Sequence, residues 1–534
     1  MRGARWGWWG CVLSLAIAAC GGRLTTIGDD GGLDATAPQG TQGGPCFPNG
    51  TCTAGLTCTV QNGAGVCSPM DAQASDVGPG PDDAPPEAGC KNLQCQQTCA
   101  STGISGKVYD PAGVLPLYNV FVYVPNDALA PIADGPSATA CQAPASGSPL
   151  VSTTTAPDGS FKLTNAPNGA NIPLVLQLGK WRRHLTIANV ATCVDNPQPD
   201  MSLRLPKKQH ETSQDDNIPL IALTTGCDAA ECFFLQRLGI DPSEFSDSGG
   251  TGRIRVYKSS NDSGQTFPSP YNTSTAQNAT YLWNTSNEMM KYDFVVDACE
   301  CSTYTRGQNG YANMLAYLGA GGRAFASHYF YNFFASSTQC TGDATCQGQG
   351  PLPTVGAWEG NQSLPYATSS CPKASQMSSP GSCLQIDTQI PRGKAFADWY
   401  AANNPLLTNG GGEAYGYCGL ADIRTDMGKL GASLLAAGTA TPWVYAGDVT
   451  NNYDGYYFTF NAPVGTSPAG QFGRAAFADV HFSEPPSGAF PSYCPGSLNG
   501  SPHAPDELAL EFLFFDLASC IQDDRQDPLT PPPN

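Results

Sequence analysis

Ser327 and His328 are neighbours in the stretch "GGRAFASHYFY", residues 321–331. A hydroxyl beside an imidazole is the pairing of a nucleophile and its general base. Two features argue against that use. Successive side chains of a strand point to opposite faces, so adjacent residues make a poor pair. A strained elbow needs small neighbours, and Ser327 is flanked by Ala326 and His328 without a bracketing glycine. We therefore expect a non-catalytic strand end, with a hydrolase as the alternative.

Other polar residues follow apolar runs elsewhere in the chain. Asp297 and Glu300 end "YDFVVDACE", and Asp479 and His481 end "GRAAFADVHFS". The carboxyl ends of parallel strands meet along one edge of an open α/β sheet, so these groups should converge with His328. Carboxylates with imidazoles suit a divalent metal or acid–base catalysis. The candidate catalytic residues are Ser327, His328, His481 and Asp297. The candidate metal ligands are Asp297, Glu300, His328, Asp479 and His481. The sequence specifies no cofactor.

The strands and helices that would form this edge of the sheet begin at about residue 214. Apolar runs alternate with helical patterns, which is typical of βαβ units and a mostly parallel sheet. Expected strands cover 218–226, 253–258, 292–299, 323–331, 441–449, 455–464 and 473–483. Expected helices cover 227–240, 279–292, 311–322 and 505–521. We interpret 335–440 as a loop-rich insertion with helices near 395–405 and 427–438. The aromatic run 329–334 is expected to pack in the core, with a stacking platform for a sugar as the alternative.

The motifs "YDFVVDAC", "MLAYLGAGGRAFASHY" and "GRAAFADVHFS" resemble the class I glutamine amidotransferase-like fold, in its trehalose-utilisation-protein-like branch. The resemblance covers about 217–335 and 440–522. It implies a flavodoxin/amidotransferase-like sheet, with the nucleophile position falling on Ser327 or His328. The amidotransferase cysteine is absent there, which favours a domain that is not catalytic.

Residues 90–213 alternate polar and apolar residues, as strands do. Two hairpins are expected, one around Pro-Ala-Gly at 111–113 and one bending at 157–159, with Asp110 and Asp158 as turn residues. The segments "GKVYDPAG", "PLYNVFVYVP" and "APDGSF" resemble the carboxypeptidase regulatory-like, transthyretin-like β-sandwich. Such domains are spacers or adhesive modules, so the resemblance implies no catalytic residue.

The first 19 residues read as an export signal, with arginines before a short apolar core. The following "IAAC" resembles a bacterial lipobox, which implies cleavage before Cys20 and acylation of that residue. Gly21 after the cysteine favours the outer membrane by analogy with lipoproteins. A plain cleaved signal and an uncleaved anchor are the alternatives. Residues 20–45 form a flexible tether, 46–68 a Cys-rich module, 69–89 a linker, 90–213 the sandwich, 214–522 the α/β domain and 523–534 a polar tail.

Cysteine usage agrees with an exported chain. Of 22 cysteines, Cys11 leaves with the signal and Cys20 carries lipid, so twenty remain in an oxidising compartment. They fall into even groups of four, four and twelve, and we expect all of them, Cys299 included, in disulfides. The predicted disulfide cysteines are Cys46, Cys52, Cys58, Cys67, Cys90, Cys95, Cys99, Cys141, Cys193, Cys227, Cys232, Cys299, Cys301, Cys340, Cys346, Cys371, Cys383, Cys418, Cys494 and Cys520.

The overall composition limits the partners. The chain has 534 residues, which is too long for one ordinary core, and a formal net charge of −19. An acidic surface repels phosphate backbones, so nucleic acid is not expected as a partner. The sequence therefore favours an outer-membrane lipoprotein, attached to the membrane through its lipid, with a binding or scaffolding role and a glycan or protein ligand. The alternatives are an exported hydrolase of sugars or peptides, and a purely structural envelope protein.

Replacing Cys20 by Ser should abolish labelling by a palmitate analogue and release the chain from membranes, because the lipobox supplies the acylated thiol. Labelling and membrane fractionation of the variant beside wild type measure both effects. Unchanged labelling would contradict the lipobox interpretation.

Overall fold

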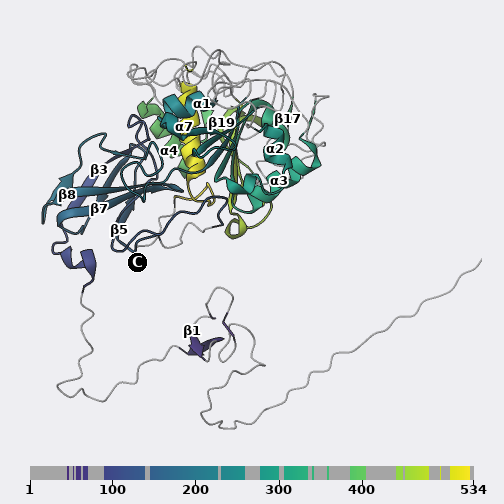
Figure 1. Ribbon diagram of the computed structural model, residues 1–534. Coiled ribbons are helices and arrows are strands. Elements are labelled where there is room, and N and C mark those ends of the chain that lie inside the picture. The colour runs from purple at the N-terminus through teal and green to yellow at the C-terminus, as the bar shows by residue number, and fades with distance from the viewer. Residues whose placement is uncertain are drawn as a thin grey trace, which may run out of the picture. The chain divides into compact units, whose positions relative to one another are not determined.

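The computed structural model describes residues 45–46, 52, 56–61, 64–69, 90–138, 145–225, 230–258, 277–299, 306–334, 340–341, 358–359, 385–403, 440–448, 452–479, 494 and 505–528. The chain divides into two compact units, Met1–Gly89 and Cys90–Asn534 (Figure 1). None of the helices in the described part is long and apolar enough to cross a membrane.

The first unit contains a small disulfide-bonded hairpin. Strands β1 (Leu56–Gln61) and β2 (Ala64–Pro69) pair antiparallel. Disulfides join Cys46 to Cys58 and Cys52 to Cys67. The hairpin is too short to bury a core of its own, so these crosslinks hold it.

The second unit begins with a β-sandwich. One sheet contains β3 (Gly103–Tyr109), β6 (Ser160–Leu163), β9 (Asp195–Pro197) and β10 (Leu203–Arg204). The other has the order β5 (Pro149–Thr154), β4 (Phe121–Pro125), β7 (Gly169–Leu178) and β8 (Trp181–Val190). Val108 of the first sheet and Val122 and Leu176 of the second lie in one buried cluster. The short 3-10 helix η1 (Asn92–Gln96) precedes the sandwich.

The strands beside the two predicted turns do not pair as regular hairpins, because β3 and β4 lie in different sheets, as do β5 and β6. The first turn does bring the chain back on itself, through an isolated antiparallel bridge between Tyr109 and Pro116. The predicted turns therefore carry the chain from one sheet to the other. Polar–apolar alternation identifies a strand but does not say which strand it pairs with. The turn chemistry itself is confirmed, because Asp110 Oδ1 accepts the amides of Val114 and Leu115 at 2.7 and 3.0 Å.

A nine-stranded mixed sheet dominates the rest of the unit. From edge to edge its strands are β12 (Phe245–Asp247), β13 (Ile254–Lys258), β11 (Ile221–Thr225), β14 (Phe294–Asp297), β15 (Arg323–Ser327), β21 (Gly473–Ala478), β20 (Asn452–Ala462), β19 (Thr441–Asp448) and β18 (Gln385–Ile386). The strands from β12 to β21 pair parallel, and the last three pair antiparallel. A second, two-stranded sheet pairs β16 (Cys340–Thr341) with β17 (Trp358–Glu359).

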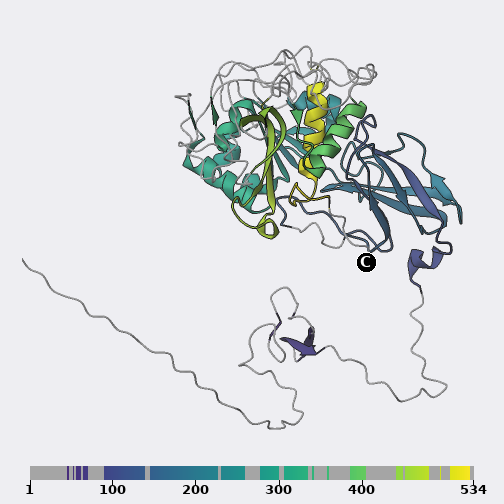
Figure 2. The same cartoon turned by 180° about the vertical axis from the view of Figure 1, so that it is seen from behind.

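Helices cover both faces of this sheet. α1 (Ala230–Cys232), α4 (Pro391–Asn403) and α7 (Pro505–Ala518) lie on one face, and α2 (Ala279–Asn284) and α3 (Gly307–Gly319) lie on the other (Figures 1 and 2). Successive side chains of β15 point to opposite faces of the sheet. Phe325 therefore belongs to one buried cluster, while Ala324 and Ala326 belong to the other. Short helical turns complete the unit. They are η2 (Phe233–Arg237, a π-helix), η3 (Pro242–Glu244), η4 (Met289–Lys291), η5 (His328–Phe333) and η7 (Pro468–Gly470).

Several predicted bounds were wrong. The helix expected over 279–292 ends at Asn284 and is followed by the separate turn η4. The strand expected over 323–331 ends at Ser327, where η5 begins. The helix expected over 427–438 lies outside the described residues, whereas the helix expected near 395–405 is α4.

Helix α7 is buried on all sides, as its apolar sequence requires. Phe512 stacks near Phe396 of α4, with ring centroids 4.6 Å apart, and Phe514 packs against Phe294 of β14 at 5.5 Å. On its other side Phe515 meets Trp181 of the sandwich at 5.9 Å. One helix therefore serves as core for both the sheet and the sandwich.

Four buried charged side chains form ion pairs at the C-terminal end of α7. Arg474 of β21 donates to Asp516 at 3.1 Å and to Asp524 at 2.8 Å, and Arg392 of α4 contacts both carboxylates. All four side chains are at most 3% exposed. Two positive and two negative charges balance, so none is left buried and uncompensated.

A second acidic residue of α7 is neutralised differently. Glu511 is fully buried and lies beside Asp110 of the sandwich. Burial, followed by the neighbouring Asp110, raises the pKa of Glu511 well above its usual value. Burial raises the pKa of Asp110 to about 7, although the amides of Val114 and Leu115 lower it. The charged groups that face the pair are Lys207, Glu507 and Arg237.

The raised pKa values make stability depend on pH. Between pH about 4 and about 7 the folded chain holds a proton that unfolded carboxyl groups have released, so the free energy of unfolding falls as pH rises. Glu511→Gln keeps a hydrogen-bond donor for Asp110 without needing the proton. We expect the free energy of unfolding of this variant to decrease less as pH rises, and the variant to be more stable than wild type at pH 8 by roughly 1–3 kcal/mol.

Urea unfolding at pH 5, 6, 7 and 8 measures this effect. Asp398→Asn on the exposed side of α4 is the matched control, because its partner Lys394 is also exposed. If the free energy of unfolding changed with pH equally in Glu511→Gln and wild type, the raised pKa assigned to Glu511 would be wrong.

Candidate functional site

The carboxyl ends of three neighbouring strands bring the predicted polar residues together. Asp297 ends β14 and Ser327 ends β15, and the register pairs Asp297 with Ala326. Ser327 is paired with Ala478, and Asp479 follows directly. The predicted residues Glu300 and His481 lie outside the described residues.

This edge is closed rather than open. Asp297, Ser327 and Asp479 are fully buried, and His328 is 3% exposed. Among the described residues, the only group of three metal-binding side chains with ligand atoms within 4.8 Å of one another is Cys46, Cys52 and Cys58. The sulfurs of that group are held in disulfides. Asp297, His328 and Asp479 therefore do not form a metal centre by themselves.

The sharp turn at this edge is centred on His328. Ser327 has extended backbone, with φ −114° and ψ 147°, whereas His328 has φ +43°. A positive φ is uncommon for a residue other than glycine, and such strain often accompanies a functional site. Of the two positions that the sequence left open for the elbow, the geometry singles out His328.

The partner of His328 is a thiol, not the neighbouring hydroxyl. Cys299 Sγ lies 3.1 Å from His328 Nδ1, and both residues are buried. Ser327 Oγ has no hydrogen-bond partner among the described residues. Ser327 and His328 therefore do not form a nucleophile–base pair.

The prediction that Cys299 is disulfide bonded was wrong, since it carries a thiol. Counting cysteines to an even number could not reveal this exception. The grouping was also wrong in part, because Cys99 pairs with Cys193. Cys90 pairs with Cys95 and Cys232 with Cys494, and Cys520 is disulfide bonded as well. The cysteines that lie outside the described residues are Cys11, Cys20, Cys141, Cys227, Cys301, Cys346, Cys371, Cys383 and Cys418.

The aromatic run after His328 is core, as predicted for its described side chains. Phe330, Tyr331, Phe333 and Phe334 are each at most 1% exposed. The guanidinium of Arg306 lies 4.2 Å from the ring centre of Phe330, which compensates part of the cost of burying that charge. These rings are therefore not available as a platform for a sugar.

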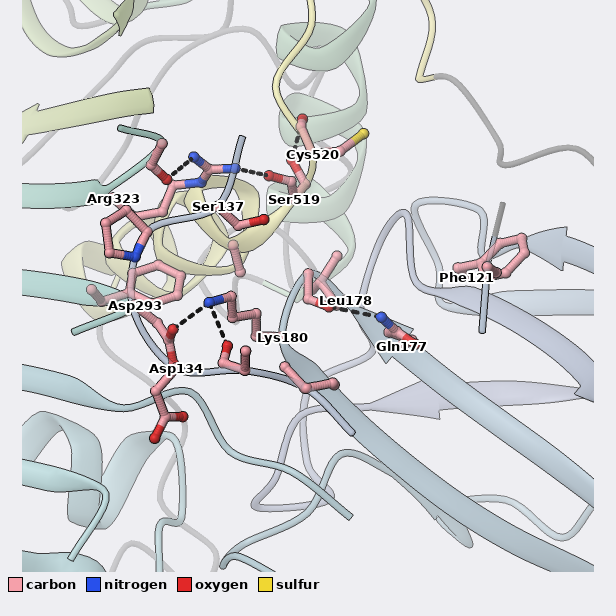
Figure 3. Close-up of a pocket in the computed structure, with 18 of the residues that line it drawn as sticks. Phe121, Asp134, Ser137, Gln177, Leu178, Lys180, Asp293, Arg323, Ser519 and Cys520 are labelled. Atoms are coloured by element: carbon pink, nitrogen blue, oxygen red, sulfur yellow. Dashed lines mark hydrogen bonds and ion pairs between the residues drawn. The ribbon is translucent and has the colours of Figure 1, made fainter. Parts of the chain in front are cut away.

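A cavity of about 510 Å³ lies at the opposite edge of the sheet, where the sandwich meets it (Figure 3). Its walls come from the loop after β4, the β7–β8 turn, the starts of β14 and β15, and the end of α7. Lys180 of the sandwich reaches Asp293 at 2.5 Å across it. This cavity could not be predicted from the sequence, because no motif marks a place where two substructures meet.

Comparison with known proteins assigns no relative to the chain. No family model matches it, and neither a curated protein nor a solved structure does. The arguments about function below therefore depend on this chain's own residues.

The Cys299 thiol should resist alkylation in the native chain and react fully in denaturant without reductant, because its burial excludes the reagent. Peptide mapping after iodoacetamide treatment measures this, with Cys232 and Cys494 as disulfide-bonded controls that stay unlabelled. Labelling of Cys299 that requires a reductant would show that it is disulfide bonded after all.

Proposed function

We propose that this chain is an outer-membrane lipoprotein that binds a glycan or protein ligand at the cell envelope. In this proposal the α/β sheet is a scaffold and not a catalyst. The export signal and lipobox support the anchoring, and the tether at 20–45 gives the compact unit reach from the membrane.

The observation that carries the proposal is the contrast between the two edges of the sheet. The polar groups at the carboxyl edge are buried, whereas the cavity lies at the amino edge against the sandwich. A catalyst needs its reactive groups exposed to substrate. A binding protein needs a preformed cavity of a few hundred cubic ångströms, which this cavity provides.

Strand order supports the flavodoxin/amidotransferase-like assignment. The order β13, β11, β14, β15, β21 is 2-1-3-4-5 when these strands are numbered along the chain. The positive φ of His328 supports an elbow at the position where the amidotransferase-like fold carries its nucleophile. The two four-stranded sheets of residues 103–204 support a transthyretin-like sandwich.

A thiol hydrolase is the second candidate, and the 3.1 Å contact of Cys299 with His328 favours it. An imidazole at this distance could take the thiol proton and leave a thiolate to attack an acyl carbon. The burial of both residues is the evidence against this candidate.

Binding and catalysis are separated by two measurements on the full-length chain. Saccharides and envelope peptides are first screened for a rise in melting temperature. A ligand at a hundredfold excess over its dissociation constant should raise it by a few degrees, roughly 3 °C. Esterase, amidase and glycosidase reporters are then tested on wild type, Cys299→Ala, His328→Ala and Ser327→Ala.

We expect a thermal shift with at least one ligand and no turnover by any form of the chain. A rate that Cys299→Ala and His328→Ala both abolish, at unchanged melting temperature, would replace the binding function by the hydrolase. Ser327→Ala is the matched control, because this buried hydroxyl does not pair with His328.

A further inference from the structure

Arg323 brings a positive charge to the cavity without a carboxylate to balance it. Its Nη1 donates to the carbonyl oxygens of Gly321 and Phe472 at 3.0 and 2.8 Å, and Nη2 donates to that of Ser519 at 3.4 Å. These partners are neutral. Among the described residues Arg323 makes no ion pair, and the charged group that lowers its pKa by repulsion is another arginine, Arg474.

The other charges around the cavity cancel one another. Lys180 pairs with Asp293 at 2.5 Å, and Arg253 pairs with Asp134 at 2.7 Å. The Lys180 ammonium also donates to the carbonyl oxygens of Ala133 and Gly135. Arg253 does not line the cavity, but its pairing with Asp134 leaves Arg323 as the charged lining residue without an ion-pair partner among the described residues.

Burial, and then repulsion by Arg474, lower the pKa of Arg323 to about 10. The guanidinium is therefore still charged at neutral pH. A half-buried guanidinium loses part of its hydration energy, and hydrogen bonds to neutral carbonyl groups replace only some of that loss. An anion bound beside the guanidinium would replace the rest.

The remaining lining combines apolar surface with hydrogen-bonding groups. Gln177 Nε2 donates to Gly179, but its Oε1 is buried without a hydrogen-bond partner among the described residues. Asn119, Ser137 and Thr154 add further polar groups, and Phe121 adds an aromatic ring. Arg323 and Phe121 lie at opposite sides of the view in Figure 3, with Gln177 and Lys180 between them. A hydroxyl donor suits Oε1, and an apolar ring face suits Phe121.

We propose that the cavity binds an acidic saccharide, with Arg323 pairing with its carboxylate and Gln177 accepting from a ring hydroxyl. A saccharide is favoured over a peptide because the lining offers several hydroxyl and amide groups around a single uncompensated charge. This inference rests on the proposed binding function and specifies its ligand class and its residues.

Calorimetric titration of the full-length chain with digalacturonate and with its dimethyl ester tests the charge requirement. The ester keeps every hydroxyl and removes only the negative charges. We expect digalacturonate to bind at least tenfold more tightly than the ester. Arg323→Gln should reduce the affinity for the acid to that for the ester and leave the ester unchanged, and Arg323→Lys should keep part of the preference.

Two further variants separate the roles of the residues. Gln177→Ala should weaken the acid and the ester equally, because the hydroxyl contact does not depend on charge. Arg255→Gln is the matched control, since Arg255 also donates to a backbone carbonyl but lies outside the cavity. The melting temperature of every variant identifies loss of fold.

The outcomes distinguish the inference from the proposed function. Equal binding of acid and ester, or an Arg323→Gln variant with full preference for the acid, would overturn the charge assignment while binding itself stands. Tight binding of acetyl-dialanine with a free carboxylate, without binding of either saccharide, would make the ligand a peptide and overturn the saccharide class. No binding of any probe, including the screened glycans and peptides, would overturn both proposals.

Discussion

Burying an acidic helix is the constraint on which the compact unit depends. Helix α7 is enclosed on every side, yet it carries Glu511 and Asp516. An isolated carboxylate in such a place would cost many kcal/mol, so each must be neutralised. Asp516 receives two arginines, one from α4 and one from β21. Glu511 receives a proton shared with Asp110 of the sandwich. The positions of a strand, a helix and the sandwich are set by these requirements.

The same helix explains why a cavity exists at the amino edge of the sheet. The sandwich and the sheet are joined through α7, Trp181 and the contact of Trp399 with Pro116, in which the indole donates to a carbonyl oxygen at 2.6 Å. Beside the end of α7, at Ala518, ion pairs from Lys180 to Asp293 and from Arg253 to Asp134 bridge the two substructures. The cavity lies next to these ion pairs. Its chemistry therefore comes from residues such as Lys180 and Arg323, whose charges would be out of place in the core.

Much of the architecture could be predicted from periodicity. The parallel strands β11, β13, β14, β15 and β21 each fall within a predicted strand, because an apolar run between helical patterns has few other solutions. The short parallel strand β12 was missed. Pairing could not be predicted in the sandwich, where β3 and β4 look like a hairpin but join different sheets. Strand β18 has two residues and was missed, since it is too short to show alternation.

The candidate site was predictable only in outline. The convergence of Asp297, Ser327 and Asp479 follows from parallel topology, which the sequence pattern indicates. Its closure does not, because burial depends on segments far away in the chain. The role of Cys299 depends on a distance of 3.1 Å that no spacing encodes. Arg323 can be recognised as a candidate binding residue only when its contacts are known, because a sequence does not show which arginine has no carboxylate as an ion-pair partner.

The distance along the chain between α7 and the surfaces that it covers also bears on when the protein can fold. Trp181 of the sandwich and Phe294 of the sheet are covered by a helix that begins only at Pro505. The disulfide from Cys232 to Cys494 spans 262 residues, and the central strand β21 begins at Gly473. A growing chain therefore holds these apolar surfaces uncovered until residues 505–518 have been made. Aggregation of the unfinished chain is the main hazard during that interval.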